Sequence, residues 1–572
     1  MKNTAGHFLY ETLKAYGVTH LFGMDEPVHL YDAIDKSIIK LITIRDEKHG
    51  AIMAHGYAKS THKPGICTSI RGPGATNLIS GLAEAFKSST PVIAIISETP
   101  SRHRGKNASQ EIDQTSLLKS VVKWVEVLDD PNRVCEMTRK VFRIATSGRP
   151  GPVALLCPQD VLSTLIDIDV YTEPGHDKYP SSRTCADKKS IQAAAELLLQ
   201  AKRPVIIGGG GCIISQASVE VIELAEMLHL PVATTIMGKG LIPDSHPLSI
   251  GVMGSYTGGK YGRGAIANRI VSMADMAFIM GSRTDQIPYS DWSLPKKETQ
   301  IIHLDIDPEE IGRNFKTRLA MVGDVKETLR ELLTYCAQTK VKPGNEWQVD
   351  EIEIQKKAWR SLNEPLFNSI DVPIRPERVL KELSSHLDEK SIIVTDASYV
   401  SSWAASHIDN LIGGDNFIFP RAMAGLGWGL PAAMGACLGQ PGKTVFCLTG
   451  DGAFGYVMNE LETAARYNIK VITLVFNNGV LGFQKHYEEL IFGKSTECQL
   501  LDINYAQVAV ALGCKGERVN SPEEINNALE RALAAETSYV LDIVIDPNAI
   551  APLTMFDNFD AKTISEKLTF FH

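Results

Sequence analysis

The chain has 572 residues, a formal net charge of −9 at pH 7 and an apolar fraction of 44%. A chain of this length is too long to fold around a single hydrophobic core, so several domains are expected. The mildly acidic composition does not favour nucleic acid or an anionic membrane as a partner, and no apolar run is long enough to span a bilayer. With no signal-peptide pattern at the start and ten scattered cysteines, we expect a cytoplasmic protein that acts on small molecules.

Short apolar runs alternate with helical patterns along nearly the whole chain. In chain order, strands are predicted at 20–24, 38–45, 91–97, 152–157, 203–209, 276–281, 300–307, 391–396, 444–450, 470–478 and 539–546. Apolar strands that are each followed by a helix are typical of parallel sheets covered on both faces. Polar residues 165–188 and charged residues 340–375, the latter with a helix, are predicted linkers. The predicted fold class is therefore α/β, with three doubly wound parallel-sheet domains.

The first candidate functional residue is an acid, Glu47, between a predicted strand and the helix that follows it. Ligands of parallel α/β sheets bind at the carboxyl ends of strands, where a desolvated carboxylate can share a proton with a ring nitrogen. An ordinary acid at a helix N-terminus explains Glu47 as well, and this segment alone favours that explanation. The Gly-Pro-Gly turn at 72–74 lets a ligand approach the backbone, but a glycine turn is weak evidence.

Residues 448–482 are more informative, because a carboxylate and an amide follow two neighbouring strands. Asp451 stands in a Gly-Asp-Gly turn after one predicted strand, and Asn478 ends the next strand along the chain. The carboxyl ends of adjacent parallel strands lie side by side, so both side chains can meet one cation. A carboxylate, an amide oxygen, a backbone carbonyl and phosphate oxygens together suit Mg²⁺. An incidental Asp and Asn in a structural turn is the alternative, but the combined pattern is specific.

With these motifs in view, the chain resembles acetolactate synthase and its relatives among the thiamine-diphosphate-dependent enzymes over nearly its whole length. The matching segments are GPGATNL (72–78), SGRPGPV (147–153), GLGWGLPAA (425–433), GDGAFG (450–455) and NNGVLG (477–482). The resemblance implies a pyrimidine-binding domain at 1–170, a central nucleotide-like domain at 186–340, a diphosphate-binding domain at 366–550 and a tail at 551–572.

The resemblance also implies the residues that hold the cofactor. Asp451, Asn478 and the carbonyl of Val480 would bind Mg²⁺, and Leu426 would hold thiamine diphosphate in a bent shape. Further cofactor contacts would come from Pro73, Asn77, Ala397, Ser398, Gly425, Gly450, Gly452, Ala453, Leu481, Gly482 and Phe483.

Two residues would act on the chemistry: Glu47 would bond the pyrimidine nitrogen of the cofactor, and Gln110 would face its reacting carbon. Glu47 and Asp451 lie in different domains. In proteins of this fold the cofactor sits between the first domain of one chain and the third domain of another. A homodimer or homotetramer is therefore expected.

Departures from the family pattern leave the substrate contacts open. Arg71, just before the Gly-Pro-Gly turn, could hold a substrate carboxylate or sulfonate, or could pair with a nearby acid. His29, with Asp25 and Glu26, could reach the substrate, although a lone loop histidine is more often structural. Gln484 could form a wall of the pocket or face solvent.

Several segments of the middle domain, most of them rich in glycine, stand where flavin-binding relatives contact FAD. These segments are GGGGC (208–212), MGKG (237–240), GVMGS (251–255), GSRTD (281–285) and HLDIDPEEIG (303–312), the last with an acid at a strand end. Such features suit a nucleotide, but an empty site explains them equally well. The segment RTDQIPY (283–289) stands where the family has a different Arg-containing segment, which argues against tight flavin binding. Because the glycine-rich segments still suit a nucleotide, FAD is kept as a candidate second cofactor.

The resemblance implies a thiamine-diphosphate- and Mg²⁺-dependent enzyme that decarboxylates pyruvate or a related 2-keto acid and joins the product to an acceptor. Alternatives are a 2-keto acid decarboxylase, an acyl-CoA lyase, a diketone hydrolase and a flavin-dependent redox enzyme similar to pyruvate oxidase. An inactive paralogue is disfavoured by the intact Glu47, Asp451 and Asn478. A dinucleotide dehydrogenase is excluded, because no GxGxxG motif opens a helix with an acid at the required distance.

Overall fold

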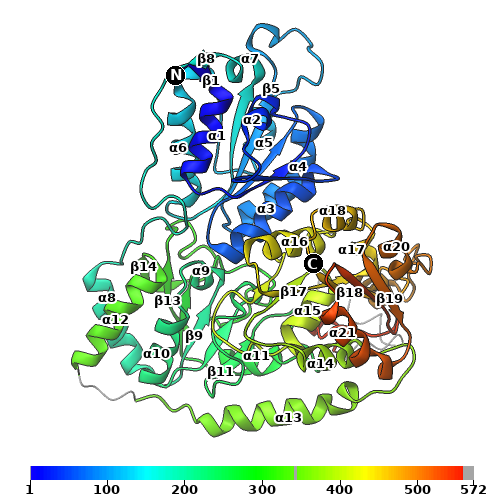
Figure 1. Cartoon of the computed structure of the whole chain (residues 1–572). Helices are drawn as coiled ribbons and strands as arrows, with labels where there is room; N and C mark the ends of the chain where they lie inside the picture. The colour runs from blue at the N-terminus through cyan, green and yellow to red at the C-terminus, as the bar shows by residue number, and fades with distance from the viewer. Residues whose placement is uncertain (1, 340–343, 558–572) are drawn as a thin grey trace.

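The computed structural model contains three six-stranded parallel sheets, each flanked by helices (Figure 1). It describes residues 2–339 and 344–557, so residues 558–572 of the expected tail lie outside the described residues. The predicted α/β class with three doubly wound parallel sheets is confirmed. No helix in the described ranges is both long and apolar enough to cross a membrane.

The N-terminal sheet, at the top of Figure 1, has the strand order β3-β2-β4-β5-β7-β6. Its strands are β2 (His20–Gly23), β3 (Lys40–Thr43), β4 (Gly65–Ser69), β5 (Val92–Glu98), β6 (Trp124–Val127) and β7 (Val153–Pro158). Its helices are α1 (Ala5–Ala15), α2 (Val28–Ala33), α3 (Glu47–Thr61), α4 (Pro73–Lys87), α5 (Gln114–Leu118), α6 (Val134–Thr146) and α7 (Gln159–Leu162). A short antiparallel pair, β1 (Asn3–Thr4) with β8 (Leu165–Ile166), joins the two ends of this domain.

The central sheet has the order β11-β10-β9-β12-β13-β14. Its strands are β9 (Pro204–Gly208), β10 (Val232–Thr234), β11 (Ser249–Val252), β12 (Met276–Met280), β13 (Gln300–Asp305) and β14 (Thr317–Val322). Its helices are α8 (Lys188–Gln200), α9 (Gly210–Ile214), α10 (Ser218–Leu228), α11 (Gly264–Ser272) and α12 (Val325–Thr339). Helix α13 (Val349–Phe367) then runs along the bottom of the molecule toward the third domain, as a helix within the predicted second linker (Figure 1).

The C-terminal sheet has the order β16-β15-β17-β18-β20-β19. Its strands are β15 (Ser391–Thr395), β16 (Phe417–Ile418), β17 (Thr444–Gly450), β18 (Ile472–Asn477), β19 (Lys515–Val519) and β20 (Tyr539–Val544). Its helices are α14 (Pro376–Ser384), α15 (Tyr399–His407), α16 (Gly429–Gly439), α17 (Asp451–Phe454), α18 (Glu460–Arg466), α19 (Gly482–Phe492), α20 (Tyr505–Ala511) and α21 (Ile525–Ala534). Because β17 and β18 are hydrogen-bonded neighbours, their carboxyl ends lie side by side.

The N-terminal and C-terminal domains share a core, because α3 packs directly against α16. A Cβ atom on Gly56 would overlap the carbonyl of Ala432, and one on Gly435 would overlap the carbonyl of Met53. The two helix backbones therefore touch, which only glycine permits at these positions. Buried apolar residues of both domains form one continuous cluster around this contact.

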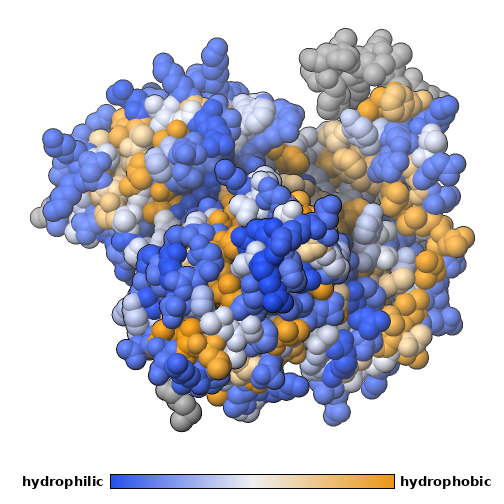
Figure 2. All heavy atoms as spheres, turned by 90° about the horizontal axis from the view of Figure 1, so that it is seen from above, coloured by the Kyte–Doolittle hydropathy of each residue, from blue (hydrophilic) through white to orange (hydrophobic). Residues whose placement is uncertain are grey.

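Figure 2 shows the face seen from above, where hydrophilic side chains prevail and hydrophobic ones are interspersed. Some of the exposed apolar side chains of the chain belong to the C-terminal domain near the segment around residue 425: Met423 is 54% exposed, Leu426 38% and Tyr456 60%. Isolated apolar residues are common on protein surfaces, but a group beside a predicted cofactor site suggests a contact surface.

Candidate active site

The C-terminal domain has a pocket of about 420 Å³ at the carboxyl ends of its parallel strands. This is where open α/β sheets bind ligands. The pocket is lined by all the residues of this domain that were predicted to contact the cofactor, with the exception of Gly425. The predicted substrate residue Gln484 also lines it. The predicted residues in the wall are Ala397, Ser398, Leu426, Gly450, Asp451, Gly452, Ala453, Asn478, Val480, Leu481, Gly482, Phe483 and Gln484.

Asp451 begins α17 directly after β17 and is only 4% exposed. Its Oδ1 accepts a hydrogen bond from the Gly452 amide at 2.9 Å and its Oδ2 accepts one from the Gly479 amide at 2.7 Å. Burial raises its pKa to about 6, because the charged form has lost water that the two amides replace only in part. A buried carboxylate in this state favours the arrival of a cation.

The loop after β18 brings Asn478 to the same place. The Asn478 side-chain oxygen accepts from the Val480 amide at 3.2 Å. Residues 498–500 hold this loop from outside, since the Leu481 amide donates to the Cys498 carbonyl and the Leu500 amide to the Gly479 carbonyl, both at 2.8 Å. The described residues contain no group of three or more His, Cys, Asp or Glu that could hold a metal ion. A cation at Asp451 would therefore use amide, backbone and ligand oxygens.

Asp396, which the sequence analysis did not single out, organises two loops of this pocket. It lies fully buried after β15, and its carboxylate accepts the amides of Ala397, Gly427, Trp428 and Gly429 at 2.7–3.2 Å. The signal that could have found it is the one that found Glu47, an acid at the end of a predicted strand.

In the N-terminal domain, Glu47 is the first residue of α3 and is 4% exposed. Its Oε2 accepts a hydrogen bond from the Asn77 side chain at 2.9 Å, and its Oε1 would lie 3.0 Å from a Cβ atom on Gly74. The structure thus brings Glu47, Asn77 and the turn that contains Pro73 together. The Gln114 side chain accepts from the Gly72 amide at 3.1 Å and holds this turn.

Glu460 of the C-terminal domain anchors the segment around Glu47. Its Oε1 accepts from the Arg45 amide at 2.8 Å and lies 2.8 Å from Nδ1 of His49. Glu460 and His49 are almost fully buried. The contact joins residues more than 400 positions apart in the sequence, so no local spacing could have predicted it.

The predicted substrate residues are less closely grouped. Arg71 pairs with Glu26 (Nη1–Oε2, 3.3 Å) and donates to the Ser109 carbonyl at 3.3 Å, so the pairing with an acid that the sequence left open is present. Gln110 is exposed, and its carbonyl packs against Gly72. His29 lies on α2, where its backbone contacts Gly6 of α1.

The two halves of the predicted site do not meet within one chain. The C-terminal pocket is lined by its own domain and by Tyr256 and Ile287 of the central domain, with no lining residue from the described part of the N-terminal domain. Glu47 and Asn77 are thus not among the residues that line the pocket of Asp451.

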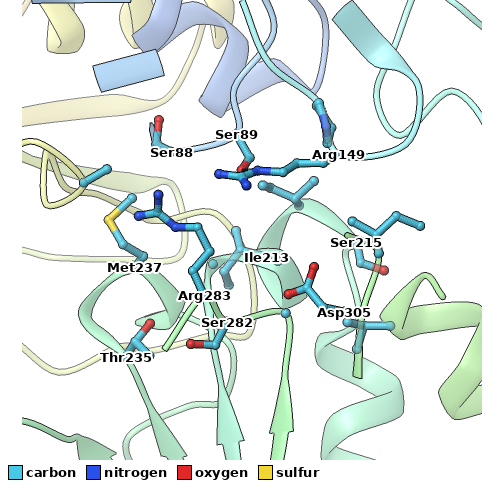
Figure 3. Close-up of a pocket in the computed structure, with 18 of the residues that line it drawn as sticks. Ser88, Ser89, Arg149, Ile213, Ser215, Thr235, Met237, Ser282, Arg283 and Asp305 are labelled. Atoms are coloured by element: carbon cyan, nitrogen blue, oxygen red, sulfur yellow. Dashed lines mark hydrogen bonds between the residues drawn. The ribbon is translucent and has the colours of Figure 1, made fainter. Parts of the chain in front are cut away.

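A second cavity, of about 140 Å³, lies where all three domains meet (Figure 3). Arg149 and Arg283 reach into it from the N-terminal and central domains, with the Asp305 carboxylate beside them. Arg149 also binds Glu310 at 2.7 Å, and Arg283 binds Asp285 at 2.7 Å. Burial raises the pKa of Asp305 to about 6.

Comparison with known protein families gives three consecutive matches. Residues 3–117 match the N-terminal TPP binding domain of thiamine pyrophosphate enzymes, residues 191–332 the central domain, and residues 396–543 the C-terminal TPP binding domain.

Curated proteins match over almost the full chain. The probable acetolactate synthase large subunit of Methanocaldococcus jannaschii is 36% identical over 557 residues, which is 95% of this chain and 92% of that protein. The acetolactate synthase of Arthrospira platensis is 33% identical, over 95% of this chain and 94% of that protein. The acetolactate synthase large subunit of Porphyra purpurea is 31% identical, over 96% and 92%.

Proposed function

Because the chain belongs to the thiamine pyrophosphate enzyme family, as a relative of the acetolactate synthases, we propose that it is a carbon–carbon lyase and ligase. It decarboxylates a 2-keto acid and joins the remaining fragment to an acceptor carbonyl, with Mg²⁺ holding the diphosphate. The observation that supports the proposal is that Asp451 and Asn478, at the ends of β17 and β18, and Leu426, in the loop before α16, line one pocket. Relatives that share the full chain length bear the name acetolactate synthase, which favours this reaction over the other thiamine-dependent ones.

Bound thiamine diphosphate would supply a carbon acid whose deprotonated form is a nucleophile toward carbonyl groups, together with a ring that can take up the electron pair of a decarboxylation. Asp451, Asn478 and the Val480 carbonyl would hold Mg²⁺, and the diphosphate oxygens would complete its shell. Leu426 would support the bend of the cofactor. Glu47, kept out of water and hydrogen-bonded by Asn77, would hold a proton at the pyrimidine nitrogen.

We propose that each active site forms between two chains, in a homodimer or homotetramer. The separation of Glu47 from the C-terminal pocket supports this, as do the exposed Met423, Leu426 and Tyr456 beside that pocket. Complementation provides the test. Chains with Glu47→Gln and chains with Asp451→Asn, each inactive alone, should regain activity when co-expressed, because one site of each mixed dimer combines two intact halves. No recovery in purified mixed dimers would place each site within one chain.

We also propose that Arg71 binds the substrate carboxylate. In the structure its guanidinium binds Glu26 and the Ser109 carbonyl, beside the turn that approaches Glu47. Its side chain is 17% exposed, so donors remain available to an incoming anion. A planar guanidinium can bond a carboxylate through two N–H groups while it keeps a second partner.

We further propose that the central cavity binds a nucleotide, with FAD as the candidate cofactor. The cavity combines Asp305 at the end of β13, where a ribose hydroxyl is commonly bound, with Arg149 and Arg283, which suit phosphates. Denaturing the purified protein and identifying released nucleotides by chromatography and absorbance tests this. A protein that neither carries nor binds FAD or its adenine nucleotide half would contradict it.

The proposed reaction is tested by removing and restoring the cofactors. After exhaustive dialysis against a chelator, turnover of 2-keto acids should be lost, and it should return only when thiamine diphosphate and Mg²⁺ are both added. Full turnover in protein free of both would overturn the proposal.

A further inference from the structure

The segment that carries Leu426 is held at both ends by buried carboxylates. On its C-terminal side, Asp396 accepts the amides of Gly427, Trp428 and Gly429. On its N-terminal side, Glu84 accepts the amide of Ala422 through Oε1 at 3.1 Å and the amides of Met423 and Ala424 through Oε2 at 2.7 and 3.2 Å. Between the two sets of hydrogen bonds stand only Gly425 and Leu426.

Side-chain packing at Gly425 and Leu426 is sparse. Apart from Gly425 and its two chain neighbours, no heavy atom of the described residues lies within 4 Å of the position a Cβ atom on Gly425 would occupy, and Leu426 is 38% exposed. Ala424 has a φ of +61°, a left-handed conformation that a non-glycine residue avoids unless its surroundings impose it. The hydrogen bonds to Glu84 therefore impose a conformation that the segment would not hold by itself.

Glu84 comes from another domain, and the buried ammonium of Lys59 lies near enough to balance part of its charge. Glu84 lies 2% exposed near the C-terminal end of α4, in the N-terminal domain, and its hydrogen-bond donors are these three amides of the C-terminal domain. Helix α4 also carries Asn77, the partner of Glu47, seven positions earlier. That spacing is about two turns, roughly 10 Å along one face of the helix. One helix thus contacts both the acid and the Leu426 segment of its own chain.

We propose that Glu84 is a positioning residue for the reaction, which sets the place of Leu426 and thereby the bend of the bound cofactor. The inference rests on the proposed function, since it needs Leu426 to support thiamine diphosphate. It means that the metal-binding residues and Glu47 are not sufficient for activity. A carboxylate of the N-terminal domain is also needed, and it acts on the cofactor through the backbone of Ala422–Ala424.

The test compares Glu84→Gln with wild-type protein, loaded with thiamine diphosphate and Mg²⁺. Glutamine keeps the length of the side chain but offers one oxygen in place of two, and its NH₂ group would face at least one of the three amides. We expect C2 proton exchange of the bound cofactor, measured by NMR, to slow by about 10²-fold, which is the loss that a displacement of reacting groups by about 1 Å can cause. The Mg²⁺ affinity should change less than about threefold, because Asp451 and Asn478 lie on other loops.

Glu377→Gln is the matched control. Glu377 is also a 2% exposed glutamate whose pKa is raised by burial. Its ion-pair partner is Arg375, and it does not line the pocket itself, although it lies beside Trp403, which does. Glu377→Gln should lower the melting temperature and leave C2 proton exchange at the wild-type rate. If Glu84→Gln only weakens the fold, it should show the same two results.

The outcomes separate the two proposals. Wild-type protein that does not bind thiamine diphosphate would overturn the proposed function. Wild-type protein that exchanges the C2 proton rapidly, with Glu84→Gln doing so at the same rate, would overturn the role of Glu84 alone. Slow exchange confined to Glu84→Gln, with Mg²⁺ binding intact, would support it.

Discussion

Replacing Asp451 by asparagine should stabilise the cofactor-free protein while it abolishes metal binding. The pKa of Asp451 is about 6 against an ordinary value of 3.8, so keeping its carboxylate charged in the fold at pH 7 costs about 3 kcal/mol. Asparagine removes this cost, but its single oxygen cannot accept from both Gly452 and Gly479, which loses about 1 kcal/mol. The net gain is about 2 kcal/mol, or a rise of about 4–8 °C in the melting temperature of a domain of this size.

The assay is thermal unfolding of wild-type and Asp451→Asn protein with and without thiamine diphosphate and Mg²⁺. At a hundred times their dissociation constant, ligands should stabilise the wild-type protein by about 2.7 kcal/mol and the variant hardly at all, so the difference between the two proteins shrinks or reverses. Asp305→Asn is the matched control, since burial raises the pKa of Asp305 to about 6 as well. It should gain stability and keep the full response to Mg²⁺ and thiamine diphosphate. A cofactor-free Asp451→Asn protein that melts below wild type would refute the reasoning, as would an undiminished ligand response.

Three further predictions concern the same site. Glu47→Gln should bind thiamine diphosphate but slow its C2 proton exchange by about 10²–10⁴-fold, measured by NMR; near wild-type exchange would reduce Glu47 to a structural role. Arg71→Ala should lower kcat/KM for a 2-keto acid by about ten- to a hundredfold and spare the methyl ester, whereas an equal fall for both would show that Arg71 only supports the fold. Because protons compete with the metal for Asp451, Mg²⁺ affinity measured by calorimetry should be constant above pH 7 and fall about tenfold per pH unit well below its pKa of about 6. An affinity at pH 5 equal to that at pH 7 would contradict this.

Most interior strands could be predicted from the sequence, whereas the interior strands β4 and β10 and several edge strands were missing from the predicted set. Strands β17 and β18 lie inside their sheet with both faces covered, so their sequences are unbroken apolar runs, and their observed ends fall within two residues of the predicted ones. The strands β6, β14 and β19 lie at sheet edges and are partly exposed. Their mixed polar and apolar sequences do not differ from those of loops, and the prediction missed them.

The same reasoning explains which parts of the candidate site could be predicted from the sequence. Asp451 and Asn478 could be paired because neighbouring parallel strands bring their ends together whatever the rest of the chain does. Glu84 and Glu460 act across domain boundaries on backbone amides, and no residue type or spacing near them marks such a contact. The pairing of Arg71 with Glu26 could be named only as an alternative, since it depends on how two loops meet.

The most direct test of the proposed reaction is a panel of 2-keto acids, supplied singly and in pairs with thiamine diphosphate and Mg²⁺, with products identified by mass spectrometry. At least one acid or pair should release CO₂ and yield a condensation product whose mass equals the two substrates minus CO₂, and Asp451→Asn should yield none. Wild-type protein that binds both cofactors yet forms no such product would contradict the proposed function. So would an Asp451→Asn protein that forms the product as well as wild type does.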